Sequence, residues 1–362
     1  MPAFPPTVKP STIDDFFMSV MLKMSKKDPT DITTPNYPLF RKLEKKEVKG
    51  VIEENPGHGP VRDIYYKTED RYTELSAGQK IQPRDYRPHE NLTRLQFDWI
   101  MLISHLAIST YDWENINTPE ELGTFLTRKK KGVDKSHRNR LVNYLWEGIT
   151  VGGQKLFGIK DVIRFTPTAD PTRGAVGGVG VADVSNHTNK SKNFNAAFDQ
   201  YVGGGQTATM LDSGANSLLS LYIDCGYNDG EGADAFPDLM PCNEIYWRCL
   251  HRLAQRKLCF YDDNSMKELG VPGITFQTMT AFYDRNIPND PNTSTYGVSM
   301  LWNSNYFEWA YAKGIRHRWS KGRERDLDTA YCWDKYSQVT ALWHGLDRFG
   351  VHYGIIPTPT TS

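Results

Sequence analysis

The sequence predicts a mixed fold of the α+β class, and three observations lead to it. Helical periodicity marks two segments, 134–149 and a stretch within 234–260, where apolar residues recur every three or four positions. Alternating apolar residues mark two strand regions, 91–110 and 328–356. The first 90 residues contain apolar elements with no evident partner in the chain. With 362 residues, the chain is long enough for two or three lobes.

The N-terminal segment, residues 1–47, is predicted to be an arm with one amphipathic helix. Residues 1–10 are rich in proline and favour an extended chain, and Ser11 can cap a helix from Thr12 to Lys26. The apolar stripe of this helix would consist of Ile13, Phe16, Phe17, Val20, Met21 and Met24. Because such a stripe is unfavourable in water, we expect it to pack against another surface.

Residues 48–90 have the pattern of a long hairpin that projects from the body. Strand-like segments flank the polar, glycine-containing turn SAGQ, which suits a loop in solvent. A two-stranded projection is marginally stable by itself, so we expect this one to lie on a partner.

The next region is predicted to contain a long strand, two helices and a further strand. The strand covers 91–110, and one of its faces would consist of Leu95, Phe97, Trp99, Met101 and Ile103. A short helix can begin at Thr118 with Pro119 in its first turn, and Asp134 can cap the longer helix at 134–149. A strand is expected within 153–163.

The second half of the chain alternates between loops and strands around one clear helix. Residues 165–205 are predicted to be rich in loops, and the apolar segment 215–226 fits either a helix or a strand. Residues 267–282 have the pattern strand, turn, strand, and residues 295–312 predict a further pair of strands.

The composition limits the classes of function. Lys and Arg equal Asp and Glu at 43 each, so the chain has no overall attraction to nucleic acid or to an anionic membrane. Its five cysteines contain no C-x-x-C pair and are expected to be reduced and mostly buried, which disfavours a zinc site. No signal peptide and no run of about 20 apolar residues is present, so we expect a soluble cytoplasmic product without a membrane partner.

Glycine is dense in residues 173–195, which raises the question of a phosphate-binding loop. The Walker A pattern G-x-x-x-x-G-K-[ST] does not occur. A Rossmann fingerprint would use Gly178 and Gly180, but Asp183 stands where the third glycine is needed. No helix is predicted directly afterwards, so no helix N-terminus is available for a pyrophosphate. The segment is therefore predicted to be a flexible surface loop.

Other catalytic and metal-binding motifs are equally weak. Residues 224–234 resemble a calcium loop, but Gly226 stands where an EF-hand needs a ligand and Asp229 where it needs glycine. The motifs H-E-x-x-H and G-x-S-x-G are absent from the sequence. We therefore predict no enzyme activity, no cofactor and no metal site. Basic runs at 127–132 and 314–325 are interpreted as solvated faces.

Several segments, in their order along the chain, resemble the major capsid proteins of tailed bacteriophages, which have the Hong Kong 97-type fold. The stretch GAVGGVGVADVSNHTNKSKN is similar to the "VGGI…WRN" stretch of one branch of that family. FPDLMPCNEIYWRCLHRLAQRK resembles its "PDLI…YxxY…QR" helix, and ELGVPGITFQTMTAF followed by YGVSMLWNSNYFEWAY resembles its "GxPIxxD…YxLN" strands. The sequence departs from the pattern where the family has Trp-Arg-Asn, because Lys192, Asn193 and Phe194 stand there.

The resemblance implies a domain order and a function. The implied domains are an N-terminal arm at 1–47, an extended E-loop at 48–90, a peripheral domain with a long spine helix at 91–165, an axial domain at 166–325, and a return to the peripheral domain with a tail at 326–362. The implied function is self-assembly as hexamers and pentamers into an icosahedral shell around a double-stranded DNA genome. Assembly in the host cytoplasm would place the protein in the virion capsid.

The resemblance also implies partners and contact residues. Scaffolding, portal and cement proteins would be partners, together with packaged DNA bound without sequence preference. Contacts between subunits are expected from the arm and the E-loop, at Phe16, Phe17, Val20, Tyr72, Leu75, Gln79 and Arg84. Lys129, Lys130 and Lys131 are candidates for facing the DNA. Two alternatives stay open: an enzyme acting on carbohydrates or nucleosides, and a phage tail or receptor-binding component.

Overall fold

The computed structural model describes the helices and strands that form the body of the chain. The described residues are 37–44, 51–54, 59–65, 92–114, 119–163, 176, 192–194, 218–226, 236–257, 273–287, 296–321, 329–343 and 348–355. The helix predicted at 12–26, most of the predicted projection and most of the glycine-rich loop lie outside these ranges.

Helices and strands are both abundant, which confirms a mixed fold. The helices are α2 (Pro38–Glu44), α3 (Thr110–Glu114), α4 (Pro119–Glu147), α5 (Ile159–Val162), α7 (Leu218–Gly226) and α8 (Glu244–Lys257), with a 3-10 helix η4 at Ser304–Tyr306. The strands are β1 (Val51–Glu54), β2 (Val61–Tyr65), β3 (Leu92–Gln96), β4 (Ile100–Ser109), β5 (Ile149–Val151), β6 (Gln154–Leu156), β7 (Lys192–Phe194), β8 (Leu239–Cys242), β9 (Gly273–Phe276), β10 (Met279–Tyr283), β11 (Tyr296–Leu301), β12 (Phe307–Ala312), β13 (Arg318–Trp319), β14 (Thr329–Trp343) and β15 (Gly350–Ile355).

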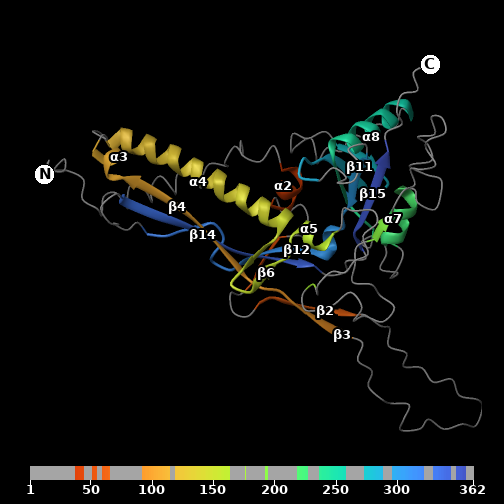
Figure 1. The fold of residues 1–362 in the computed structure, drawn as a ribbon, viewed down its shortest axis with the longest axis horizontal. Helices are drawn as coiled ribbons and strands as arrows, with labels where there is room; N and C mark the ends of the chain where they lie inside the picture. The colour runs from red at the N-terminus through yellow and green to blue at the C-terminus, as the bar shows by residue number, and fades with distance from the viewer. Residues whose placement is uncertain are drawn as a thin grey trace, which may run out of the picture.

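The strands form two larger sheets at opposite ends of the molecule (Figure 1). In the five-stranded sheet the order is β1-β12-β14-β13, and β4 pairs with β14. The second sheet has the order β7-β15-β11-β8-β10-β9. Helix α4 runs along β4 and β14, whereas α7 and α8 lie beside the six-stranded sheet (Figure 1). The small β2–β3 ribbon points away from both.

An aromatic cluster joins the two sheets where the chain crosses between them. The crossings follow β11 and β14, and they bring together Trp302, Phe307, Trp343 and Phe349. The ring centroids of Phe307 and Trp343 are 4.7 Å apart, and those of Trp302 and Phe349 are 5.2 Å apart, both in edge-to-face geometry. Because all four rings are fully buried, they contribute a large part of the core that holds the two sheets together.

Helix α4 differs from the prediction, because it is one continuous helix of 29 residues. The sequence predicted two helices, with the second capped by Asp134, yet this residue lies inside α4. The helix ends at Gly148, whose φ of +68° is the left-handed conformation that glycine favours. A Cβ there would lie 2.1 Å from the Asp161 Oδ2 atom, so the position also needs glycine for space.

The strand predicted at 91–110 is present, but it is divided and its second half faces the other way. Leu95, Phe97 and Trp99 are buried as predicted, whereas Met101 and Ile103 are 50% and 43% exposed. Residues 97–99 form no regular strand between β3 and β4, and this irregularity shifts the alternation by one position. The residues of β4 that face α4 are instead Ile100, Leu102, Leu106 and Ile108.

Two strand pairings and one element also differ from the sequence prediction. The strands predicted within 295–312 exist as β11 and β12, but they belong to different sheets and are not a hairpin. Strand β1, which was expected within the projection, pairs in parallel with β12 in the five-stranded sheet. In the region where a strand was expected at 153–163, the structure has the short strand β6 followed by α5.

The second predicted helix and the state of the cysteines are confirmed for the residues that the structure describes. Helix α8 buries Tyr246 and Leu250 against the six-stranded sheet, and the ambiguous segment 215–226 contains helix α7. Within the described ranges Cys225, Cys242 and Cys332 are buried and form no disulfide.

Candidate functional site

The β2–β3 ribbon is the described root of the predicted projection. Its strands pair from Val61 with Gln96 to Tyr65 with Leu92, and the chain between them, 66–91, lies outside the described residues. The Arg62 guanidinium donates two hydrogen bonds to Glu308 Oε2 in β12, at 2.6 and 2.9 Å. Both side chains are mostly buried, so this pair ties the ribbon to the five-stranded sheet.

The lysine run on α4 does not form a single surface. Lys129 and Lys131 are exposed, but Lys130 is only 6% exposed and points toward the sheet. Successive residues of a helix are about 100° apart, so three in a row cannot share one face. The Lys129 ammonium lies 5.2 Å from the Phe125 ring centroid and 4.0 Å from Asp112 Oδ2.

A polar cleft of about 410 Å³ lies between the C-terminal end of α4 and the turn after β10. It is lined by Asn143, Trp146, Glu147, Lys160, Asn243, Glu244, Tyr283, Asp284, Arg285, Asn286 and Ile287. Burial raises the pKa of Asp284 to about 6, although hydrogen bonds from Asn286 and Leu39 oppose this. The Asp284 Oδ1 atom accepts hydrogen bonds from the backbone and side-chain nitrogens of Asn286, both at 2.9 Å. This carboxylate therefore stabilises its own turn.

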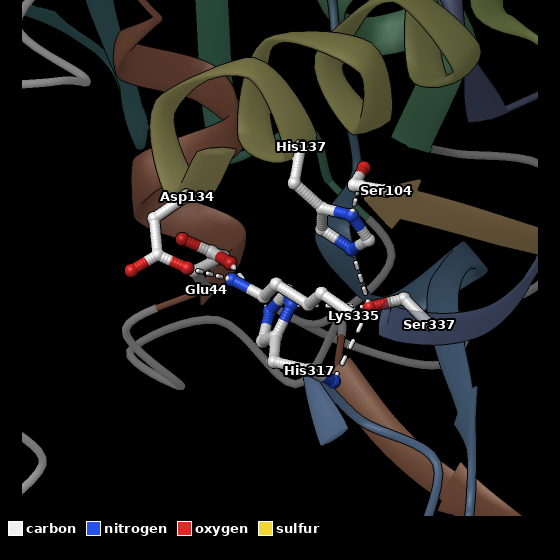
Figure 2. A network of polar contacts seen from close by, with 7 residues as sticks. All are labelled: Glu44, Ser104, Asp134, His137, His317, Lys335 and Ser337. Atoms are coloured by element: carbon white, nitrogen blue, oxygen red, sulfur yellow. Dashed lines mark hydrogen bonds and ion pairs between the residues drawn. The ribbon is translucent and has the colours of Figure 1, made fainter. Parts of the chain in front are cut away.

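A buried polar network connects α2, α4 and the five-stranded sheet (Figure 2). It runs through Ser104, His137, Ser337, His317 and Glu44, which come from β4, α4, β14, the turn after β12, and α2. His137 Nδ1 lies 2.8 Å from Ser104 Oγ, and His137 Nε2 lies 2.7 Å from Ser337 Oγ. Ser337 Oγ is also 3.1 Å from His317 Nδ1, while His317 Nε2 faces Glu44 Oε1 at 3.6 Å.

These contacts fix which atoms of the network donate. The Glu44 carboxylate is beyond hydrogen-bond distance of His317 Nε2, but its negative charge favours the hydrogen of His317 on that nitrogen, so that Nδ1 accepts from the Ser337 hydroxyl. Ser337 then accepts from His137 Nε2–H, and also from the His317 backbone N–H at 3.2 Å. His137 Nδ1 finally accepts from Ser104. The side-chain hydrogen bonds of this network are thus all donated in the same direction, from Ser104 through His137 and Ser337 to His317, and both imidazole rings are neutral.

Burial and charge favour these protonation states. Burial lowers the pKa of His137 to about 3, and the charges of Lys335 and His317 add to this effect. Burial also lowers the pKa of His317, together with the charges of Lys335 and Arg138, although Glu44 opposes the shift. Both rings are therefore neutral at neutral pH.

The acid at the end of the network stays ionised. Burial raises the pKa of Glu44, but the contact with His317 and the charges of Arg138 and Arg316 outweigh burial and leave the pKa lowered. A carboxylate that is charged at neutral pH favours the hydrogen of His317 on Nε2, as the direction of the hydrogen bonds requires.

A second buried contact crosses the network beside His137. The Lys335 ammonium of β14 donates to Asp134 Oδ1 of α4 at 2.5 Å (Figure 2). Burial lowers the pKa of Lys335, although Asp134 opposes this by favouring the charged form. Asp134 therefore points inward from α4 toward the sheet, and it holds the middle of the helix on β14.

The network has the residue types of a hydrolase triad, but its surroundings do not fit that reaction. Ser337 is fully buried and lines neither of the two hollows described for this molecule. Its hydroxyl already contacts two imidazoles and one backbone N–H. Attack on a substrate needs an accessible oxygen, so this arrangement supports a structural role.

The described part of the chain contains no group of three or more His, Cys, Asp or Glu side chains that could hold a metal ion. Among the same residues, no helix combines the length and the apolar character needed to cross a membrane.

All seven residues that the sequence predicted for contacts between subunits are outside the described ranges. These are Phe16, Phe17, Val20, Tyr72, Leu75, Gln79 and Arg84. The network of Figure 2 was not predicted from the sequence, because its members are far apart along the chain and form no motif. A signal was present only in α4, where polar residues interrupt the apolar stripe at Lys130, Asp134 and His137.

Known structures share this fold, although no protein-family profile and no curated protein sequence matches the chain. The capsid asymmetric unit of cyanophage A-1(L) is similar with a TM-score of 0.54 at 10% identity, over 90% of this chain and 94% of that chain. The holo-SrpI encapsulin complex from Synechococcus elongatus PCC 7942 has a TM-score of 0.48 at 8% identity, over 92% and 94%. The mature capsid of bacteriophage PhiM1 has a TM-score of 0.47 at 10% identity, over 86% of each chain.

The match to the cyanophage capsid carries the structural conclusion, because it is the strongest of these and spans nearly the whole of both chains. It shows that this chain has a mixed helix and sheet fold like that of phage capsid proteins. The resemblance predicted from the sequence is therefore confirmed at the level of the fold.

Proposed function

We propose that this protein is a structural protein that self-assembles as hexamers and pentamers into an icosahedral shell enclosing a double-stranded DNA genome. The observation that carries the proposal is the shared fold with a phage capsid subunit over 90% of this chain. The shape supports it, since an extended body with a long helix and a projecting ribbon presents much surface to neighbours (Figure 1). Such surfaces suit heterologous contacts, which close into rings or continue into lattices.

The ribbon gives this proposal a physical basis in the molecule. Two paired strands bury little apolar surface by themselves. The β2–β3 ribbon is held to the body by contacts that include the ion pair between Arg62 and Glu308. A projection on this ribbon gains stability by lying on an adjacent subunit. Within the predicted ranges 48–90 and 1–47, β1 and α2 belong to the body. We therefore assign the part of 48–90 beyond β1 as the E-loop and the part of 1–47 before α2 as the arm that contacts neighbours, through the seven contact residues predicted from the sequence.

The remaining domains follow the same proposal. Residues 91–165, with α4 as the spine helix, and 326–362 would form the peripheral domain, and 166–325 the axial domain. Scaffolding, portal and cement proteins would be partners during assembly in the host cytoplasm, and the shell would hold DNA by contacts without sequence preference. Its role would be structural and not enzymatic.

Assembly of the purified full chain tests the proposal. We expect rings or shells in the megadalton range by negative-stain electron microscopy and mass photometry, because many weak contacts add up in a closed lattice. The experiment should be run with and without a scaffolding protein encoded beside this one. A chain that stays monomeric at high concentration under both conditions would contradict the proposed function.

A truncation that lacks residues 1–30 tests the role of the arm. The body should keep its melting temperature, since residues 1–30 precede all the helices and strands described here. Assembly should fail or become irregular, because the Phe16, Phe17 and Val20 stripe would be missing. Normal shells from the truncated chain would refute the contact role of the arm.

A further inference from the structure

The outward surface of α4 carries one sign of charge over three turns. Its exposed basic residues are Arg128, Lys129, Lys131, Lys135 and Arg140, which we call the basic face. From position 128 to position 140 the helix rises about 18 Å. Lys130 is excluded because it is buried on the opposite side. The basic face is therefore a different set of residues from the lysine run in the sequence.

Few acids lie along this surface of α4. Glu121 and Glu147 are exposed at the two ends of the helix, and between them the only acidic residue is Asp134, a half-buried side chain whose contact with Lys335 turns it toward the sheet (Figure 2). Asp112 in α3 approaches Lys129 to 4.0 Å and so offsets one charge at one end of the face. The chain as a whole is neutral, so a surface with this excess is a local feature.

A hollow lies within the basic face around a glycine that the fold does not require. The hollow measures about 570 Å³ and is lined by Phe125, Arg128, Lys129, Gly132, Val133 and Ser136. A Cβ on Gly132 would meet no atom within 4 Å, so packing does not explain the absence of a side chain. Glycine inside a helix is less stable than alanine, so the position loses stability without a gain inside the subunit.

We propose that the basic face of α4 binds the phosphate backbone of double-stranded DNA, with Gly132 allowing a phosphate to approach between Arg128 and Lys129. This inference rests on the proposed function, and it would make the outward side of α4 the inner wall of the shell. Contacts of this kind read charge and not base sequence. The hydroxyl of Ser136, which lines the same hollow, can donate to a phosphate oxygen.

The chemistry of the face favours a polyphosphate over an acidic protein. A protein helix that docks in a groove needs several apolar contacts, and the basic residues of the face outnumber the large exposed apolar residue beside it, Tyr111, which adjoins Asp112 at one end. Phe125 and Val133 beside the hollow are partly buried in the subunit core. The face thus offers five exposed positive charges around an open, shallow hollow, and it is the row of charges that suits a chain of phosphates.

The test measures binding of a short fluorescent DNA duplex to the full-length protein by anisotropy, over salt concentrations from about 50 to 200 mM. The variant Lys131→Gln with Lys135→Gln removes two charges of the face. The matched control is Lys313→Gln with Lys321→Gln, which removes two exposed charges near β13. We expect the first variant to lower the slope of log affinity against log salt by about 1.8, and the control to keep the wild-type slope.

The variant Gly132→Ala separates a binding role from a structural one. It should raise the melting temperature, because alanine favours the helix and has free space, and it should weaken DNA binding by filling the hollow. Unchanged binding would overturn the role of the hollow. Equal salt slopes for the two double variants would overturn the proposal, as would a poly-glutamate competitor that displaces DNA at equal charge concentration.

Electron microscopy of the same preparations keeps the two proposals distinct. Wild-type shells together with unaltered DNA binding by the Lys131 and Lys135 variant would overturn this inference and leave the proposed function standing. A protein that forms no shells but loses DNA binding in that variant would contradict the proposed function and support the basic face as a DNA site.

Discussion

Replacing Ser337 with alanine should destabilise the protein far more than the loss of one hydroxyl suggests. The Ser337 Oγ atom contacts His137 Nε2 at 2.7 Å, His317 Nδ1 at 3.1 Å and the His317 backbone nitrogen at 3.2 Å. Alanine leaves all three polar atoms without this partner, in a site where Ser337 is fully buried. A buried polar group without its partner costs about 1–3 kcal/mol, so the expected loss in unfolding free energy is about 3–6 kcal/mol.

Ser104→Ala is the matched control, because it removes a hydroxyl from the other end of the same network. Ser104 has a single contact there, with His137 Nδ1, so the expected loss is about 1–2 kcal/mol. Chemical unfolding of the unassembled subunit, followed by tryptophan fluorescence at neutral pH, measures both variants. If Ser337→Ala loses less than Ser104→Ala, or stays within about 1 kcal/mol of wild type, the assignment of donors and acceptors is wrong.

Three other predictions concern pH, helix packing and the ribbon. The pKa of His137 is about 3 in the folded protein and 6.5 in the unfolded chain, so the unfolded chain takes up a proton first as the pH falls. The free energy of unfolding should therefore fall by up to about 5 kcal/mol from pH 6.5 to 3. If the free energy of unfolding of His137→Gln depends equally on pH, this prediction is wrong. Gly297→Ala would place a Cβ 2.8 Å from the Tyr246 backbone and should lower stability by about 1–3 kcal/mol in calorimetry. Arg62→Ala should speed amide hydrogen exchange in β2 and β3 more than in β12. If the exchange rates of β2 and β3 equal those of the wild type, the ribbon does not depend on the contact with Glu308.

The sequence predicted most elements of the fold but divided α4, and the buried network explains this error. At both ends of the helix the side facing the sheet is apolar, with Leu122 and Leu126 at one end and Leu141 and Leu145 at the other. In the middle this side is polar, so the apolar periodicity is interrupted for about three turns. The partners that make burial of those polar groups acceptable lie about 200 residues away, and no local pattern reports them.

Errors in strand facing and pairing have a different cause. Local alternation of apolar residues identifies a strand, and the sequence shows this alternation. Which side of the sheet each side chain occupies depends on the exact residue spacing, and one irregular residue moves all later side chains to the other side. At Trp99 and Ile100 two consecutive residues are buried, and every later residue of β4 is therefore shifted. Similarly, β11 and β12 were correctly predicted as strands, but they belong to different sheets, and the aromatic cluster around Trp302 lies where the chain crosses between them.

The sequence drew attention to the basic stretch of α4, and its contact with DNA stays a prediction. The placement of each charge on the helix requires the helix register and the contact between Asp134 and Lys335. That contact turns the one acid of this stretch toward the sheet, so the inward polar side of α4 leaves an excess of positive charge on its outward side, which Asp112 offsets only at Lys129. A variant such as Lys335→Met should therefore affect both properties: it leaves Asp134 without its buried partner, and it frees that carboxylate to compete with DNA at the basic face.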